Sequence, residues 1–264
     1  MSFALIFLLF AAAAQIGLFA ILFLTVSAHE AAHVLTAKLF GLNVESIDIT
    51  PMGQAARIPG LNGTPPLKRL VIILSGPFLN IIIAVICMIF SFQTAAAINW
   101  AIALWNLLPS PPLDGGRLLL LVLDFFFGFS LANKICRVIS MIISVLLICA
   151  GFARTILFPY DISLLFAAFY LFKLSKKELC MAAFDFYKYI FSGEEKYKRP
   201  MGVKNLFIPP SMPLKKALDK LCYDRVIVYH IFTDNGILNI SEKQLINYAC
   251  ENGPAGTIGE IYDF

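Results

Sequence analysis

The stretch LFLTVSAHEAAHVL, residues 22–35, decides the fold class and the kind of site that the sequence predicts. It is an apolar run that predicts a helix, with two histidines and a glutamate near its end. On a helix, His29 and His33 lie one turn apart and point the same way, which suits two nitrogens binding one metal ion. Glu30 lies beside them, where it could take a proton from a water held by that ion. Two histidines at this spacing are also common as buried, hydrogen-bonded residues, so their surroundings decide the interpretation.

Composition places most of the chain in lipid. Of 264 residues, 59% are hydrophobic and only 14% are charged, whereas a soluble domain averages roughly a quarter charged residues. The net charge of +4 is spread over loops and helix ends, which fits anchoring at a membrane surface and excludes a nucleic-acid partner. A glutamate inside a bilayer costs several kcal/mol, so Glu30 at membrane depth indicates a functional site.

The six cysteines show no CxxC spacing, which argues against a disulfide framework or a cysteine zinc site.

The apolar runs predict a polytopic all-α membrane bundle of about six transmembrane helices, since about 20 residues cross the hydrocarbon core. A break at residues 15–17 separates the first two runs, and the first is predicted to be retained as a span. An even number of spans with basic loops on one side places both termini in the cytoplasm; Arg154, near an outer turn, is an exception. Residues 1–175 form this membrane domain, and its expected spans are 2–14, 16–39, 67–92, 95–108, 138–153 and 162–174.

Residues 41–66 are polar and rich in turn-forming residues. Residues 44–49 and 54–58 alternate apolar and polar side chains on either side of Pro51-Met52-Gly53, which predicts two short strands in a membrane-associated β-hairpin. An ordinary solvated loop is the alternative. Lys38, Arg57, Lys68 and Arg69 flank the segment and predict that it lies on the cytoplasmic side.

A second polar element lies in NLLPSPPLDGGR, residues 106–117. Three prolines in four residues cannot continue a helix, so the chain must unwind before an apolar helix resumes at about residue 118. Asp114 in such a segment is either part of a loop turn or needs a partner, for which a cation is the natural choice. The ends of the second and fourth spans lie on the same side, so Asp114 can approach His29 and His33. Two histidines and one carboxylate, with a fourth position left to water, compose a catalytic zinc site.

The third span contains Ser75-Gly76-Pro77 and Asn80. The proline is expected to kink the helix, and Asn80, one turn beyond Gly76, could face a cavity that the small residues open. The alternative is a glycine at a helix-packing contact with a satisfied asparagine, which is common in membrane bundles.

These motifs together resemble the site-2 protease family of intramembrane zinc metalloproteases. The resemblance rests on HEAAH (residues 29–33), NLLPSPPLDG (106–115) and SGPFLN (75–80). It implies a Zn²⁺ held by His29, His33 and Asp114, Glu30 as general base, and Asn80 orienting the substrate or steadying the oxyanion. The order of elements is most similar to the stage IV sporulation protease branch. That branch implies a bacterial multi-pass membrane protein that releases a membrane-associated pro-sigma factor. It is also compatible with inhibitory membrane partners.

The remaining residues have the composition of a soluble domain. Residues 176–199 are predicted to be a charged linker, and residues 200–264 a small cytoplasmic α+β domain. The expected elements are a helix at 213–222, strands at 225–232 and 237–240 around an Asp234-Asn235-Gly236 turn, and a helix at 242–250 that begins with a capping box of Ser241 and Gln244. This domain resembles a single CBS module, which implies a homo-oligomer because a lone module normally pairs with another copy. Gln244 stands where nucleotide-binding modules usually have an aspartate, which argues against adenine-nucleotide binding.

One other class of protein would use the same ligands. A membrane metal-ion transporter or zinc sensor would not need Glu30 as a base, but it would usually need polar groups that continue across the membrane. The fifth and sixth spans supply almost none. The sequence therefore favours a metalloendopeptidase that cleaves a membrane-associated substrate in or near its membrane segment.

Overall fold

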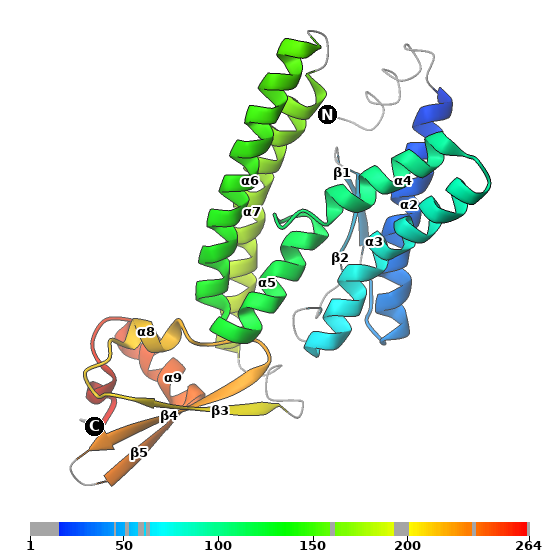
Figure 1. Ribbon diagram of the computed structural model, residues 1–264. Helices are drawn as coiled ribbons and strands as arrows, with labels where there is room; N and C mark the ends of the chain where they lie inside the picture. Colours follow the sequence, from blue (N-terminus) through cyan, green and yellow to red (C-terminus); the bar gives the residue numbers. More distant parts are fainter. Residues whose placement is uncertain are drawn as a thin grey trace. The chain divides into compact units, whose positions relative to one another are not determined.

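The structure is a computed structural model that describes residues 16–44, 46–50, 53–57, 61, 64–158, 162–192, 201–233 and 236–262 (Figure 1). The chain divides into two compact units, residues 1–118 and 119–264. The first expected span, residues 2–14, lies outside the described residues.

The first unit is built on three helices that pack against one another: α2 (Ile16–Leu39), α3 (Pro66–Ile89) and α4 (Gln93–Asn106). On α2 the buried residues recur every four positions, so they form one face; they are Thr25, His29, His33 and Ala37. Leu24 and Leu35 on the same helix are exposed by 66% and 61%. The polar side chains therefore point inward and the apolar ones outward, the reverse of a soluble bundle and the pattern expected of a protein whose solvent is lipid.

Helix α2 has the bounds predicted from the sequence, and its C-terminal end carries a clear signal. Gly41, with a φ of +78°, reverses the chain after Leu39, and the N–H of Leu42 donates to the carbonyl of Ala37. Helix α3 begins with Pro66 in its first turn and continues through Pro77.

The predicted hairpin is present in the first unit. Strand β1 (Ser46–Thr50) pairs antiparallel with β2 (Gly53–Arg57), in a register that joins Ser46 to Arg57 and Thr50 to Gly53. Strand β2 lies against α2. The hairpin, and not the solvated loop, is thus the element between the second and third expected spans.

The proline-rich segment leaves the helical path between α4 and α5 (Asp114–Phe127), as predicted. The peptide bond between Pro111 and Pro112 is cis. A side chain at Gly115 would overlap the carbonyl of Leu107, and one at Gly116 would overlap the backbone at Ser110 and Pro111. The two glycines therefore let the unwound segment fold back over the start of α5. The helix resumes at Asp114, four residues earlier than expected, because a carboxylate is favourable in the first turn of a helix.

The second unit contains a pair of long antiparallel helices, α6 (Phe129–Leu157) and α7 (Ser163–Ser192). A Cβ on Gly151 would lie 2.9 Å from Cα of Leu165, and the side-chain amide of Asn133 donates to the carbonyl of Leu179 at 3.3 Å. These contacts show that the two helices approach closely at both ends of the pair.

Among the described residues, three helices are long and apolar enough to cross a membrane: α2, α3 and α6. Helices α4 and α5 have 14 residues each, or about 21 Å at 1.5 Å per residue, which is shorter than a hydrocarbon core. Helix α7 has the length, but lysines and a glutamate follow Phe172 within it. The chain is therefore a membrane protein, while the count of six spans stays a prediction.

The end of the chain forms a three-stranded sheet with helices on it. Strand β3 (Gly202–Ile208) pairs parallel with β4 (Arg225–Thr233), and β4 pairs antiparallel with β5 (Gly236–Ser241). Strands β4 and β5 and helix α9 (Glu242–Asn252), with its capping box, confirm the predictions. Helix α8 (Leu214–Leu218) is shorter than expected, and β3 and a 3₁₀ helix at Ile258–Tyr262 were not predicted.

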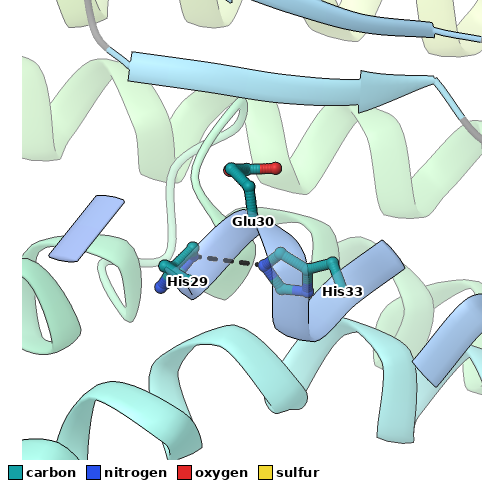
Figure 2. A group of neighbouring side chains, drawn as sticks. All are labelled: His29, Glu30 and His33. Carbon is teal, nitrogen blue, oxygen red and sulfur yellow. Dashed lines mark hydrogen bonds between the residues drawn. The ribbon is translucent and has the colours of Figure 1, made fainter. Parts of the chain in front are cut away.

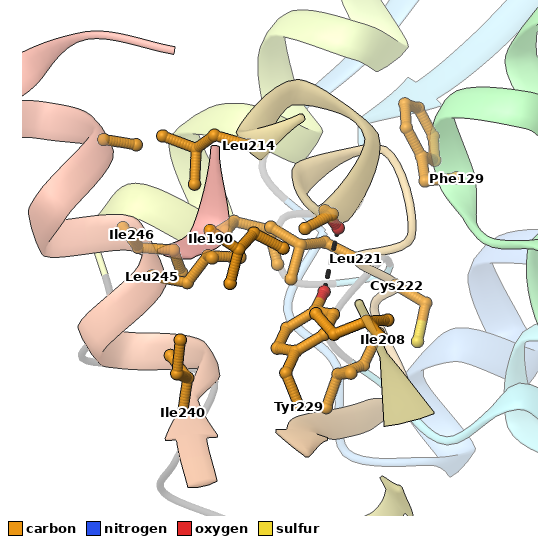
Figure 3. Packing of buried hydrophobic residues seen from close by; sticks show 14 of the residues in the cluster. Phe129, Ile190, Ile208, Leu214, Leu221, Cys222, Tyr229, Ile240, Leu245 and Ile246 are labelled. Carbon is orange, nitrogen blue, oxygen red and sulfur yellow. Dashed lines mark hydrogen bonds between the residues drawn. The ribbon is translucent and has the colours of Figure 1, made fainter. Parts of the chain in front are cut away.

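The sheet domain shares its apolar core with the two long helices (Figure 3). Phe129 of α6 stacks on Phe186 of α7 with ring centroids 4.1 Å apart, and Tyr223 meets both rings edge-on. The backbone N–H of Phe129 donates to the carbonyl of Leu221. The hydroxyl of Ser130 donates to Asp219 at 2.5 Å.

This packing explains a difference from the expected linker at 176–199. Helix α7 runs through that segment to Ser192, because Leu179, Phe186 and Ile190 recur at helical spacing and are buried. The charges among them mask the pattern in the sequence. Residues 193–199 lie outside the described residues.

Candidate metal centre

The two histidines of α2 converge as their spacing predicts. Figure 2 shows the side chains of His29 and His33 beside each other on adjacent turns, with their rings nearly perpendicular and with Glu30 projecting from the same part of the helix. Their Nε2 atoms lie 3.2 Å apart, and both residues are buried. Two imidazole nitrogens this close can bind a single metal ion when both present their lone pairs to it.

Asp114 completes a triangle with them. Its Oδ2 lies 3.0 Å from His29 Nε2 and 3.2 Å from His33 Nε2. Neighbouring ligand atoms of a tetrahedral zinc ion, each at 2.0–2.1 Å from the metal, are separated by about 3.3 Å. The three sides of this triangle, 3.0, 3.2 and 3.2 Å, therefore match one face of a zinc tetrahedron. The fold brings the carboxylate to the histidines from 85 and 81 residues away.

Space for the ion exists because residue 76 is a glycine. A Cβ on Gly76 of α3 would lie 2.7 Å from His29 Nε2 and still closer to His33 Nε2. Such an atom would stand in front of both nitrogens, where a metal ion would bind. The interpretation of Gly76 as an ordinary packing glycine is therefore incomplete, because its missing side chain leaves the volume that the ion needs.

The outer nitrogen of His33 is held by the backbone of α3. Nδ1 of His33 lies 2.7 Å from the carbonyl oxygen of Ile72 and 3.3 Å from Oγ of Ser75. A carbonyl can only accept, so Nδ1 carries the proton and donates it, which leaves the lone pair of Nε2 for a metal.

The outer nitrogen of His29 meets a side chain instead. Nδ1 of His29 lies 3.2 Å from Nδ2 of Asn80, and Asn80 is 0% exposed. Asn80 was predicted at the site only through a resemblance to the family motif. The structure brings it against a histidine ring.

Glu30 belongs to the same group of side chains. It is half-buried, and its carboxylate and the two histidine ligand atoms all lie within 4.8 Å of one another. At that distance the carboxylate is close enough to exchange a proton with a water molecule bound beside the histidines. All five residues singled out from the sequence therefore meet in the first unit.

Two contributors on α3 were not predicted from the sequence: the carbonyl of Ile72 and the hydroxyl of Ser75, both against His33 Nδ1. The signal that could have found Ile72 is its four-residue spacing from Gly76 and Asn80, which places the three residues on one face of a helix.

Known proteins resemble this chain in sequence and in fold. The model of peptidase family M50 matches residues 17–94 and 88–150, together just over half of the chain. Zinc metalloprotease MJ0392 of Methanocaldococcus jannaschii is 25% identical over 245 residues, which cover 86% of this chain and 69% of that protein. Stage IV sporulation protein FB of Bacillus subtilis is 28% identical over 137 residues, 48% of each chain. A solved site-2 protease from Methanocaldococcus jannaschii superposes with a TM-score of 0.53 at 25% identity, over 62% of this chain and 78% of that chain.

The convergence of two histidines, a glutamate and an aspartate between the helices of a membrane protein, together with these matches, identifies the class as intramembrane metalloproteases. The chain is a member of peptidase family M50, the site-2 protease family, and is a zinc-dependent metalloendopeptidase. The predicted family, enzyme class and zinc are thus confirmed, and the transporter or sensor alternative is set aside.

Proposed function

We propose that this protease hydrolyses a peptide bond in or near the membrane segment of a membrane-associated protein. The observation that carries the proposal is the triangle of His29 Nε2, His33 Nε2 and Asp114 Oδ2 within helices that expose leucines outward. Those three side chains would hold the zinc ion. A substrate that reaches the triangle must share the lipid environment of the helices around it.

The residues around the metal divide the chemistry between them. Bound zinc would supply a Lewis acid that polarises the attacking water and the scissile carbonyl. Glu30 accepts the proton of that water and later passes it to the leaving amine. Ile72 and Ser75 keep His33 in the orientation that directs its Nε2 inward.

The β1–β2 hairpin offers a way to present the substrate. A helical peptide hides its carbonyl groups, so the substrate must unwind before water can attack. An unwound segment can add to the free edge of a two-stranded sheet by β-augmentation. The hairpin packs beside α2 through β2, and Figure 2 shows a strand of it crossing the side of α2 from which Glu30 projects. This arrangement supports a role for the hairpin edge in presenting the unwound segment.

The likeness to stage IV sporulation protein FB supports a finer proposal, in which the substrate is a pro-sigma factor processed during sporulation. The same proposal includes a multi-pass protein of a bacterial membrane with both termini in the cytoplasm. The basic residues Lys38, Lys68 and Arg69 at the ends of α2 and α3 support this orientation.

For the terminal domain we propose a CBS-like module that pairs with a second copy. Its order of strand, helix, strand, strand and helix supports the likeness, and Phe207 and Phe232 stack on the exposed sheet face, where a second copy could cover them. The side chain of Gln244 accepts a hydrogen bond from the N–H of Ser241 in the capping box, so it is not placed to hold a ribose. This contact supports the proposal that the module does not bind an adenine nucleotide.

The proposed function is tested by cleavage in vesicles. We expect the purified protein, reconstituted with a panel of single-span membrane proteins that includes a pro-sigma factor, to cleave at least one within or beside its span. A zinc chelator should abolish cleavage and added zinc should restore it. Cleavage only of soluble, unfolded peptides would contradict the proposal. Cleavage of other members of the panel but not of the pro-sigma factor would contradict its finer form.

The ligand role of Asp114 has its own test. Replacing one carboxylate oxygen by an amide in Asp114→Asn removes the negative charge of the triangle, so zinc affinity should fall at least about tenfold. Metal content of the purified protein, measured by competition with a chromogenic chelator, gives the result. Asp219→Asn in the terminal domain is the matched control and should keep the wild-type zinc content. Unchanged zinc in Asp114→Asn would remove Asp114 from the ligand set.

A further inference from the structure

The two histidines of the site are held in different ways at their outer nitrogens. A neutral imidazole that binds a metal through Nε2 must carry its proton on Nδ1, and the partner of Nδ1 decides whether it does. For His33 the partner includes the carbonyl of Ile72 at 2.7 Å, which fixes the metal-binding tautomer. For His29 the partner of Nδ1 is the carboxamide of Asn80 at 3.2 Å, which can act as either donor or acceptor.

The orientation of that carboxamide determines what His29 can bind. With its NH₂ group toward Nδ1, Asn80 would donate, the proton of the ring would lie on Nε2, and the metal would lose a ligand. Rotating the amide by 180° exchanges its oxygen and nitrogen with almost no change of shape. The other terminal atom, Oδ1, has no hydrogen-bond partner among the described residues, so no second contact there holds the amide in its present orientation.

Burial makes the choice consequential. Asn80 is 0% exposed and His29 is 3% exposed, so bulk water does not compete for the contact between them. A hydrogen bond in such surroundings is stronger than one in water, and an unpaired partner costs more. Burial therefore favours Asn80 over solvent as the partner of His29 Nδ1.

We propose that Asn80 is a positioning residue, whose side-chain oxygen accepts the Nδ1–H of His29 and so directs the Nε2 lone pair of His29 at the metal. The inference rests on the proposed function, since it concerns the same ligand set. It differs from the role that the family resemblance implies for Asn80, because it requires no contact with substrate. Partners of this kind typically change metal affinity about 10–100-fold when they are removed.

Three variants of the whole 264-residue chain test the proposal. Asn80→Leu removes the acceptor at nearly equal volume, and zinc affinity measured by chelator competition in detergent should fall about 10–100-fold. Asn80→Asp can only accept from Nδ1–H, so it should keep the affinity within a few-fold of wild type. Asn99→Leu is the matched control: it removes another buried asparagine of the same unit, bonded to Ala95 and Thr25, and should leave zinc affinity unchanged.

Each contrary result has a distinct meaning. Wild-type zinc affinity in Asn80→Leu, with cleavage reduced, would overturn the proposal and place Asn80 on the substrate. Equal losses in Asn80→Leu and Asn80→Asp, or in Asn80→Leu and Asn99→Leu, would also overturn it, because a packing role would then explain the effect. If Asn80→Leu does not fold, a loss of about tenfold in Asn80→Asp alone contradicts the inference. Failure of the wild-type protein to bind zinc would instead refute the proposed ligand set.

Discussion

The variant Glu30→Gln should bind zinc as well as the wild-type protein and lose cleavage by a factor of about 10² to 10⁴, the usual contribution of a general base. Glutamine has nearly the size and shape of glutamate but cannot accept a proton at neutral pH. The three atoms that converge at 3.0–3.2 Å belong to His29, His33 and Asp114, so the substitution leaves them in place. Zinc content and the rate of cleavage of a co-expressed membrane substrate are the two measurements.

Glu178→Gln, the same change on α7 in the second unit, is the control and should leave both quantities unaltered. A Glu30→Gln variant that cleaves at the full rate would remove Glu30 from the chemistry. A variant that loses zinc along with activity would show that the carboxylate is itself a ligand.

The second large effect is expected for Gly76→Ala, which should abolish zinc binding and, with it, cleavage. The added methyl group would stand 2.7 Å from His29 Nε2 and closer still to His33 Nε2, where the metal must bind. Alanine stabilises a helix relative to glycine by about 1 kcal/mol, so loss of α3 is not the expected cause. Metal content after purification in zinc, and the thermal midpoint of the same sample, separate the two explanations.

Gly17→Ala is the matched control. It makes the same change within α2, where no described atom lies within 4 Å of the new Cβ, and it should leave zinc content at the wild-type value. Wild-type zinc content in Gly76→Ala would mean that α2 and α3 separate when the metal binds, which would contradict the arrangement described for the site.

The chemistry of the site could be predicted from the sequence because it depends on short-range spacing. His29, Glu30 and His33 occupy one turn of one helix, and the prolines before Asp114 predict that the helix is interrupted there. The bounds of α2 come from a long apolar run that ends before a glycine. None of these predictions needed to know what packs against what.

The elements that could not be predicted depend on partners far along the chain. Strand β3 is recognisable only beside β4, with which it pairs in parallel, and the second half of α7 is helical because Phe186 meets Phe129 and Tyr223. The roles of Gly76 and Asn80 also come from a neighbouring helix. The spacing of Ile72, Gly76 and Asn80 marks one face of α3, but a glycine carries no sign of what occupies the space that it leaves, so the spacing does not reveal the two histidines beside it.

The separation of the proposed ligands along the chain gives the metal a mechanical role besides its chemical one. His29 and Asp114 are 85 residues apart in sequence, and a zinc ion between them would cross-link the two ends of the first unit. Closing so long a loop restricts the unfolded chain strongly, and the free energy of metal binding becomes free energy of folding. The ion that activates water would then also stabilise the folded first unit. Loss of the metal would weaken the packing of its helices as well as stop the reaction.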